Sequence, residues 1–193
     1  MENASDIDTR LGTRIKALRS AQGLSLDALA GRAGVSRSMI SLVERGEASP
    51  TAAVLDRLAA GLGTTLAALF AEEARADGEP VSRRSEQAAW RDPQTGYLRR
   101  NLSPRGFPSP IELVEVELPA GTRVAYDAAF RSAPVHQQVV VLAGTLVLGI
   151  GEETHRLEAG DCIAMRLDRP TMFHNPGAEP SRHLVALVVE RGI

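Results

Sequence analysis

The apolar residues of this 193-residue chain change their spacing near residue 80, and this change limits the possible folds more than any other feature. Up to about residue 71 they recur every three to four residues, as on amphipathic helices. After the change they occur in short β-type runs separated by Gly and Pro. A chain of this length holds one or two hydrophobic cores. We therefore expect an all-α domain at residues 9–71, a linker at 72–83 and an all-β domain at 84–193.

The first half is expected to fold into five short helices. Ser25, Ser36 and Thr51 precede three of them at the N-cap position, where a hydroxyl accepts a hydrogen bond from a free backbone N–H group. The following segment, EEARADGEPVSR, has no apolar period and contains Gly78 and Pro80, so it is expected to be a solvated linker.

The second half is expected to consist of strands. Turn residues separate the apolar runs at near-regular intervals, and no helix-length pattern interrupts them. An antiparallel sandwich or barrel is therefore favoured over alternating strands and helices. The expected strands are Ile111–Leu118, Val135–Leu142, Thr145–Ile150, Asp161–Met165, Thr171–Asn175 and Leu184–Glu190.

Charge is distributed unevenly along the chain, although its net value is only -2. Residues 9–71 contain eight Arg and Lys against four Asp and Glu, a net charge of +4, and acidic segments lie on both sides. A compact positive block of this kind fits a domain that faces phosphate groups. The charge pattern thus favours nucleic acid as a partner of the first domain.

The sequence favours a cytoplasmic protein without a membrane partner. Its start, MENASDIDTR, lacks the basic and apolar regions of a signal peptide. The longest nearly apolar run, Val139–Gly151, is shorter than the ~18 residues of a membrane-spanning helix. Cys162 is the single cysteine and is expected to be a buried structural thiol. His183 has no partner at a meaningful spacing and is given no role.

Residues 25–46, SLDALAGRAGVSRSMISLVERG, combine two helical patterns around a glycine turn. Gly34 suits the left-handed turn conformation, and Val35, Ile40 and Val43 fill the space beneath the second helix. The other side of that helix is polar. Together with the following proline and amphipathic segment, this pattern resembles the phage-repressor-like (XRE-type) helix-turn-helix family over about residues 9–71.

The resemblance implies double-stranded DNA as partner, with the start of the second helix in the major groove. Arg37 and Ser38 would then reach base edges, and Arg45 would contact phosphate. Pairing of two half-sites implies a homodimer. Leu26 departs from the family, which often has a Gln there that contacts the DNA backbone. The expected DNA-binding residues are Ser25, Ser36, Arg37, Ser38, Ser41 and Arg45.

The second half carries two further motifs, HQQVVVLAGT at residues 136–145 and LEAGDCIAMRLDRPTMFHNP at 157–176. They resemble the two motifs of a cupin, a double-stranded jelly-roll barrel, over about residues 105–193. Trp90–Asn101 would form a hairpin that leads into it. A repressor-like domain joined to one cupin resembles a class of bacterial regulators whose barrel senses a small molecule.

Metallocupins hold iron, manganese or similar ions through His and Glu side chains of these motifs. The matching positions here carry Arg131 and Ala133 (or Ser132), Gln137 and Thr171, so the resemblance implies neither metal nor cofactor. Side chains at such positions point into the barrel, and strand alternation adds three more to the same face. The expected ligand-binding residues are Arg131, Gln137, Val139, Val141, Thr171 and Phe173.

The sequence therefore predicts a sequence-specific transcriptional regulator that binds DNA through residues 9–71 and senses an unidentified small-molecule effector without a metal. The main alternative is a cupin-type enzyme, an isomerase or dioxygenase with an accessory helical domain. A third class is an antitoxin or scaffold, which would bind DNA and a partner protein without a small ligand. The sequence contains no P-loop, dinucleotide fingerprint, nucleophile elbow or C-x-x-C motif, so no other catalytic class is indicated.

Overall fold

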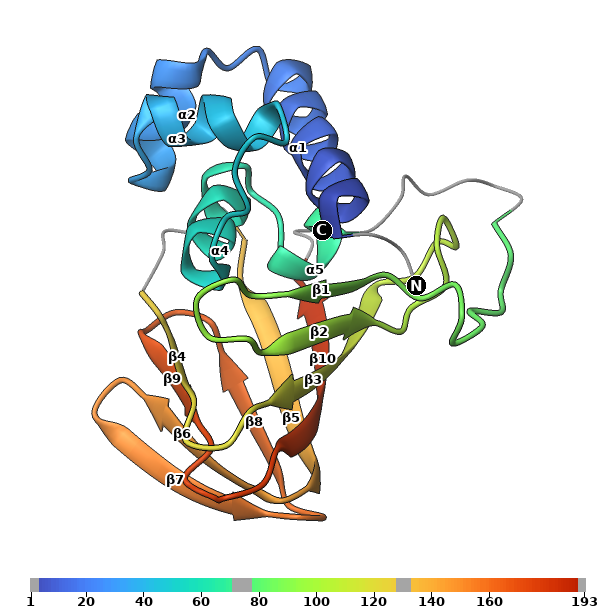
Figure 1. Cartoon of the computed structure of the whole chain (residues 1–193), viewed down its shortest axis with the longest axis vertical. Helices are drawn as coiled ribbons and strands as arrows, with labels where there is room; N and C mark the ends of the chain where they lie inside the picture. The colour runs from blue at the N-terminus through green and yellow to red at the C-terminus, as the bar shows by residue number, and fades with distance from the viewer. Residues whose placement is uncertain (1–3, 71–77, 128–132, 191–193) are drawn as a thin grey trace.

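The computed structural model describes residues 4–70, 78–127 and 133–190. It has a helical N-terminal domain above a mostly-β C-terminal domain (Figure 1). The helices of the described chain are α1 (Ala4–Ala21), α2 (Leu26–Ala33), α3 (Arg37–Glu44), α4 (Ala52–Gly61) and α5 (Leu66–Leu69). None of these helices is long and apolar enough to cross a membrane.

Hydroxyl side chains define where the helices begin. The Oγ of Ser25 accepts a hydrogen bond from the Ala28 N–H, and Ser36 and Thr51 cap α3 and α4 in the same way. These three N-cap predictions are confirmed. Gly34 ends α2 with φ of 63°, a left-handed conformation that explains the glycine in the turn.

Helices α1 and α3 cross with little space between their backbones. A Cβ on Gly12 would lie 2.2 Å from the Val43 carbonyl oxygen, so only glycine fits at this crossing. Next to it, the Arg19 guanidinium donates two hydrogen bonds of 2.6 and 2.8 Å to the Glu44 carboxylate. The orientation of α3 is therefore fixed from its buried side.

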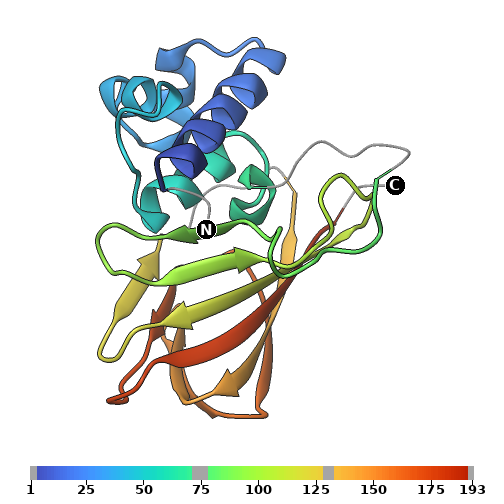
Figure 2. The same ribbon diagram turned by 45° about the vertical axis from the view of Figure 1, so that its right-hand side comes forward.

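The β domain consists of two antiparallel sheets (Figures 1 and 2). The six-stranded sheet has the order β1-β2-β3-β10-β5-β8, with β1 (Ala89–Arg91), β2 (Leu98–Asn101), β3 (Ile111–Leu118), β10 (Ser181–Val189), β5 (Val135–Ala143) and β8 (Cys162–Arg166). The four-stranded sheet has the order β4-β9-β6-β7, with β4 (Arg123–Tyr126), β9 (Thr171–His174), β6 (Thr145–Ile150) and β7 (Glu153–Glu158). Within the described residues, no strand pairing joins the two sheets.

The strands differ from the sequence expectation in three respects. Strands β4 and β7 were not predicted, and β10 begins three residues before Leu184. The expectation that Cys162 is buried is wrong, because its side chain is exposed. Alternation along β8 turns Ile163 and Met165 toward the core and Cys162 toward solvent.

The helical domain packs on the β1–β2 hairpin and on β3 (Figure 2). The rings of Phe70 and Trp90 contact each other across the junction, with centroids 5.8 Å apart. The Thr65 hydroxyl, which caps α5, donates a hydrogen bond to the Glu112 carboxylate on β3, and the Asn101 amide donates to the Ala67 carbonyl at 3.2 Å. These contacts place the base of the helical domain directly on the β domain.

Candidate functional site

Helix α3 has a polar face toward solvent and an apolar face toward the core. Ile40 and Val43 are buried beneath it, whereas Arg37 and Ser38 are exposed at its N-terminal end and Ser41 is half-buried. The Ser36 hydroxyl caps the helix and lies 3.2 Å from the Ser38 hydroxyl. The apolar face anchors the helix, and its polar end is free to approach another molecule.

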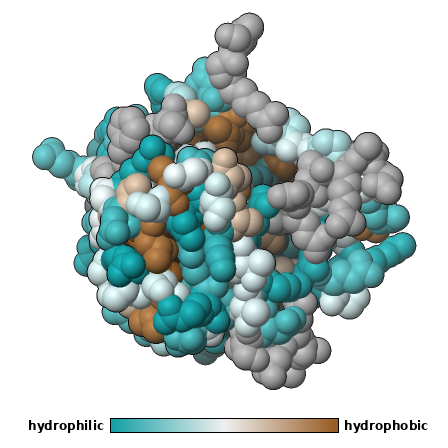
Figure 3. All heavy atoms as spheres, turned by 90° about the horizontal axis from the view of Figure 1, so that it is seen from above, coloured by the Kyte–Doolittle hydropathy of each residue, from teal (hydrophilic) through white to brown (hydrophobic). Residues whose placement is uncertain are grey.

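The expected contacts of α3 lie on one side of this helix or at its end, while Ser25 caps the neighbouring α2. Figure 3 views the molecule from above, on the side of the helical domain. Most of the coloured surface is hydrophilic or intermediate there, and apolar residues form small patches. Arg37 faces Asp27 at 3.5 Å, and both side chains are mostly exposed. Such an exposed pair is weak and leaves the Arg37 guanidinium available.

Arg45 is the more strongly engaged of the two arginines. Its guanidinium donates hydrogen bonds to the Glu47 carboxylate at 2.8 and 2.7 Å and also to the Ser41 hydroxyl. The hydrogen bond with Glu47 raises the pKa of Arg45 and lowers the pKa of the Glu47 carboxyl. The Glu47 carboxylate would therefore compete with a phosphate for the Arg45 guanidinium.

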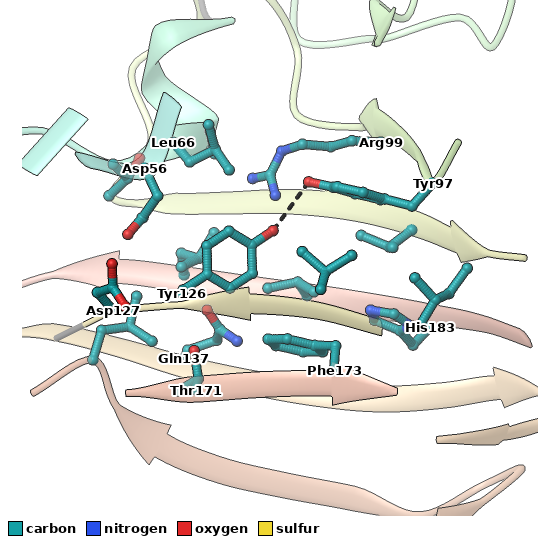
Figure 4. A pocket seen from close by; sticks show the side chains of 18 of the residues that line it. Asp56, Leu66, Tyr97, Arg99, Tyr126, Asp127, Gln137, Thr171, Phe173 and His183 are labelled. Atoms are coloured by element: carbon teal, nitrogen blue, oxygen red, sulfur yellow. Dashed lines mark hydrogen bonds between the residues drawn. The ribbon is translucent and has the colours of Figure 1, made fainter. Parts of the chain in front are cut away.

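A second candidate site is a pocket enclosed by both domains (Figure 4). The β domain supplies most of its wall, while Asp56 of α4 and Thr65, Leu66 and Ala67 at α5 come from the helical domain. Apolar and polar side chains contribute to the wall in nearly equal numbers. The polar lining residues are Asp56, Thr65, Tyr97, Arg99, Tyr126, Asp127, Gln137, Arg169, Thr171 and His183.

The structure brings three of the sequence-predicted ligand-binding residues to this pocket. Gln137 on β5 and Thr171 and Phe173 on β9 line it, each less than one-tenth exposed. Val139 and Val141 share the inward face of β5 with Gln137, but they are buried in the core and do not line the pocket. Arg131 lies outside the described residues.

Several pocket residues were missed by sequence reasoning. Tyr97 and Arg99 come from the β1–β2 hairpin, Tyr126 from β4 and His183 from β10. Alternation with Val185 and Leu187 places His183 on the inward face of β10, a signal that does not depend on a partner histidine at a set spacing. The assignment of no role to His183 is therefore corrected to a place in the pocket wall.

The aromatic and imidazole groups of the pocket are uncharged at neutral pH. Burial raises the pKa of Tyr97, and burial together with Tyr97 raises the pKa of Tyr126 well above its ordinary value. Their hydroxyl oxygens lie 3.1 Å apart. Burial, with a smaller effect of Arg99, lowers the pKa of His183 to about 4. The His183 ring stacks on Phe173 with centroids 5.7 Å apart, and within the described ranges its Nδ1 has no hydrogen-bond partner.

The chemistry of this pocket suits binding of a small organic molecule. Hydroxyl, amide and guanidinium groups converge on a space with apolar walls, which is the usual composition of ligand sites. Within the part of the chain that the structure describes, no three His, Cys, Asp or Glu side chains are grouped so that they could hold a metal ion.

Comparisons with known proteins match the helical domain and, for longer relatives, most of the chain. A family model described as a helix-turn-helix domain matches residues 10–72. The HTH-type transcriptional regulator SutR of Escherichia coli (strain K12) is 28% identical over 182 residues, which cover 92% of this chain and 93% of SutR. Control protein C.MunI of Mycoplasma sp is 33% identical over 69 residues, which cover 35% of this chain and 93% of that protein.

A solved structure extends the similarity to the arrangement of the whole chain. The crystal structure of an HTH_3 family transcriptional regulator from Vibrio cholerae superposes with a TM-score of 0.77 at 27% sequence identity. The match covers 98% of this chain and 100% of the Vibrio protein. The helical domain and the β domain therefore occur together in a protein of the same architecture.

Proposed function

We propose that this chain, which belongs to the XRE-type helix-turn-helix transcriptional regulators, binds specific DNA sequences and responds to a small molecule held in its β domain. The relatives that match nearly the whole chain are named as transcriptional regulators, which favours a regulator over a cupin-type enzyme. In this proposal the two packed sheets are a cupin-type barrel that acts as a sensor and carries out no reaction.

DNA recognition is assigned to the exposed end of α3. Arg37 and Ser38 would reach base edges in the major groove, with Ser25, Ser36, Ser41 and Arg45 contacting or approaching the DNA backbone. A single helix of this length spans only a few base pairs, so the proposal includes a homodimer that binds two half-sites. A cytoplasmic location follows from this role at the DNA.

The observation that carries the sensing role is the composition of the pocket wall. Leu66 and Ala67 of the helical domain and Arg99, Gln137 and His183 of the β domain line the same space. A molecule bound there contacts both domains at once. Its binding free energy would therefore depend on their relative placement, which is the requirement for coupling between ligand and DNA.

The proposal is tested with the full-length protein and DNA selected by it from a random pool. Enrichment of a two-fold symmetric sequence, and its loss with Arg37→Ala, would support the DNA-binding role. A thermal-shift screen of metabolites, with and without added metal ions, would then identify molecules that stabilise the protein. Failure to enrich any sequence, or metabolites that are converted to product, would contradict the proposal.

A further inference from the structure

We infer that the molecule sensed in this pocket carries an anionic group, a carboxylate in the first instance, which pairs with Arg99. This inference rests on the proposed sensing function and adds the chemical class of the ligand. Its main observation is a buried cation. Arg99 is only 7% exposed, and its Nε has no hydrogen-bond partner among the described residues.

The part of the chain that the structure describes provides no ion pair that neutralises this guanidinium. Within the described residues, no Asp or Glu oxygen lies within 4.0 Å of the Arg99 nitrogens. The carboxylate of Glu112 accepts a hydrogen bond from the Thr65 hydroxyl. Burial raises the pKa of Glu112, and the charge of Arg99 lowers it by a smaller amount. Since a buried charge without a counter-charge is costly, a guanidinium that lies beside a cavity without a carboxylate partner indicates an anion-binding site.

The groups around Arg99 are hydrogen-bond donors. Figure 4 shows Tyr97 beside Arg99 on one wall, with Tyr126 reaching toward both and His183 farther along. The two tyrosine hydroxyls share one hydrogen bond of 3.1 Å, so one of their two O–H protons remains to be donated. The neutral His183 ring has an N–H as well. A set of N–H and O–H donors around a positive charge matches an anion, and the planar guanidinium matches a carboxylate in particular.

The pocket carboxylates lie toward the other end. Figure 4 shows Asp56 and Asp127 on the side opposite Tyr97 and His183. Apolar side chains, among them Leu118, Val124 and Val185, fill much of the wall between the polar groups. The favoured ligand is therefore a small carboxylic acid with an apolar chain or ring, held at its carboxylate by Arg99.

The test uses pairs of molecules that have one shape and differ in charge: butyrate with butyramide and benzoate with benzamide. Binding to the full-length protein is measured by calorimetry and by thermal shift, without DNA. The variants are Arg99→Met and, as a matched control, Arg100→Met. Arg100 is the next residue on β2, on the opposite face, and its guanidinium lies 3.8 Å from the Glu115 carboxylate.

At least one carboxylate should bind the wild-type protein roughly tenfold or more tightly than its amide, and Arg99→Met should remove this preference. Arg100→Met should retain it. Without any ligand, Arg99→Met should melt no lower than the wild-type protein, because it removes an unpaired buried charge. Arg99→Lys, which keeps the charge and loses the planar fork, should still prefer carboxylates but bind them more weakly.

Three results would overturn the inference. The first is that the amides bind as tightly as the carboxylates. The second is that none of the four molecules binds at millimolar concentration. The third is that Arg99→Met keeps the preference for carboxylates. The proposed regulatory function is judged separately, by DNA binding. Carboxylate binding that does not change the affinity for DNA would support the anion site and contradict the sensing role. A DNA affinity that changes only with neutral molecules would support the sensing role and contradict the anion site.

Discussion

The carboxylate of Asp92 accepts a hydrogen bond of 2.6 Å from the backbone N–H of Ala52, the first residue of α4. Asp92 lies in the β1–β2 turn and is 2% exposed. Its second oxygen accepts the N–H groups of Gln94 and Thr95, each at 2.8 Å. One buried carboxylate thus closes the hairpin of the β domain and caps a helix of the DNA-binding domain, at the end where the helix dipole favours negative charge.

Replacing Asp92 with Ala should therefore destabilise the junction between the domains. The change removes three hydrogen bonds to a charged acceptor, and we expect a loss of about 2–4 kcal/mol in the free energy of unfolding. Trp90, the single tryptophan, contacts Phe70 across the same junction, so its fluorescence during urea unfolding reports the effect. Asp168→Ala, which removes an exposed carboxylate paired with Arg169, is the control. Equal losses in the two variants would contradict the role given to Asp92.

The helical domain was largely predictable because its signals are local. The hydroxyl residues at the N-caps of α2, α3, α4 and α5 and the glycines in the turns act within a few residues of the helix that they bound. The β domain was predictable where its strands are apolar, and β3 and β6 have the expected bounds. Strand β7, Glu153–Glu158, was missed because it lies at the edge of its sheet and four of its six residues are exposed.

The pocket was less predictable than the fold, for physical reasons. Gln137, Thr171 and Phe173 followed from strand alternation, which is a local property. An inward-facing Arg99 contradicts the usual preference of arginine for the solvent face, so the sequence of the hairpin did not identify it. The contribution of Leu66 and Ala67 depends on how the helical domain sits on the β domain, and no sequence pattern states that arrangement.

Arg37→Ala should relax the sequence preference of DNA binding. If the side chain reaches a base edge, its removal should cost about 1–3 kcal/mol on the preferred sequence and much less on others. Fluorescence anisotropy with the selected DNA and single-base variants of it measures this difference. Arg32→Ala removes the same charge from α2 and should leave the base preference unchanged. An unchanged preference in Arg37→Ala would exclude Arg37 from base recognition.

Arg45→Ala should weaken binding to all sequences by a similar factor. Its guanidinium is exposed and pairs with Glu47, a weak contact that a DNA phosphate can replace. Loss of one phosphate contact should make the dependence of log affinity on log salt shallower by about 1 per subunit. Glu47→Gln, which removes the competing carboxylate, should strengthen binding at low salt. A salt dependence identical to that of the wild-type protein would show that Arg45 does not contact phosphate.

Thr171→Val should reduce the response to a pocket ligand while leaving DNA affinity without ligand nearly intact. The substitution keeps the shape of a residue that is 6% exposed and removes its hydroxyl from the pocket. Gln137→Ala should act in the same way, and the coupling of about 1–3 kcal/mol expected between ligand and DNA should fall toward zero. DNA titrations with and without a bound carboxylate measure this coupling. Thr145→Val, on β6 outside the pocket lining, should retain the full response.

His183 should make the stability of the protein depend on pH between about 6.5 and about 4. Its pKa is about 4 in the folded protein against an ordinary value of 6.5, so in this range the unfolded chain binds more protons than the folded one. Stability contributed by the neutral ring is therefore present above pH 6.5 and is lost as the pH falls toward 4, by about 3 kcal/mol at most. His183→Gln removes the titrating group, and its free energy of unfolding, measured in urea across this range, should fall less steeply than that of the wild-type protein. Parallel pH profiles for the two proteins would show that His183 is not held neutral by its buried position.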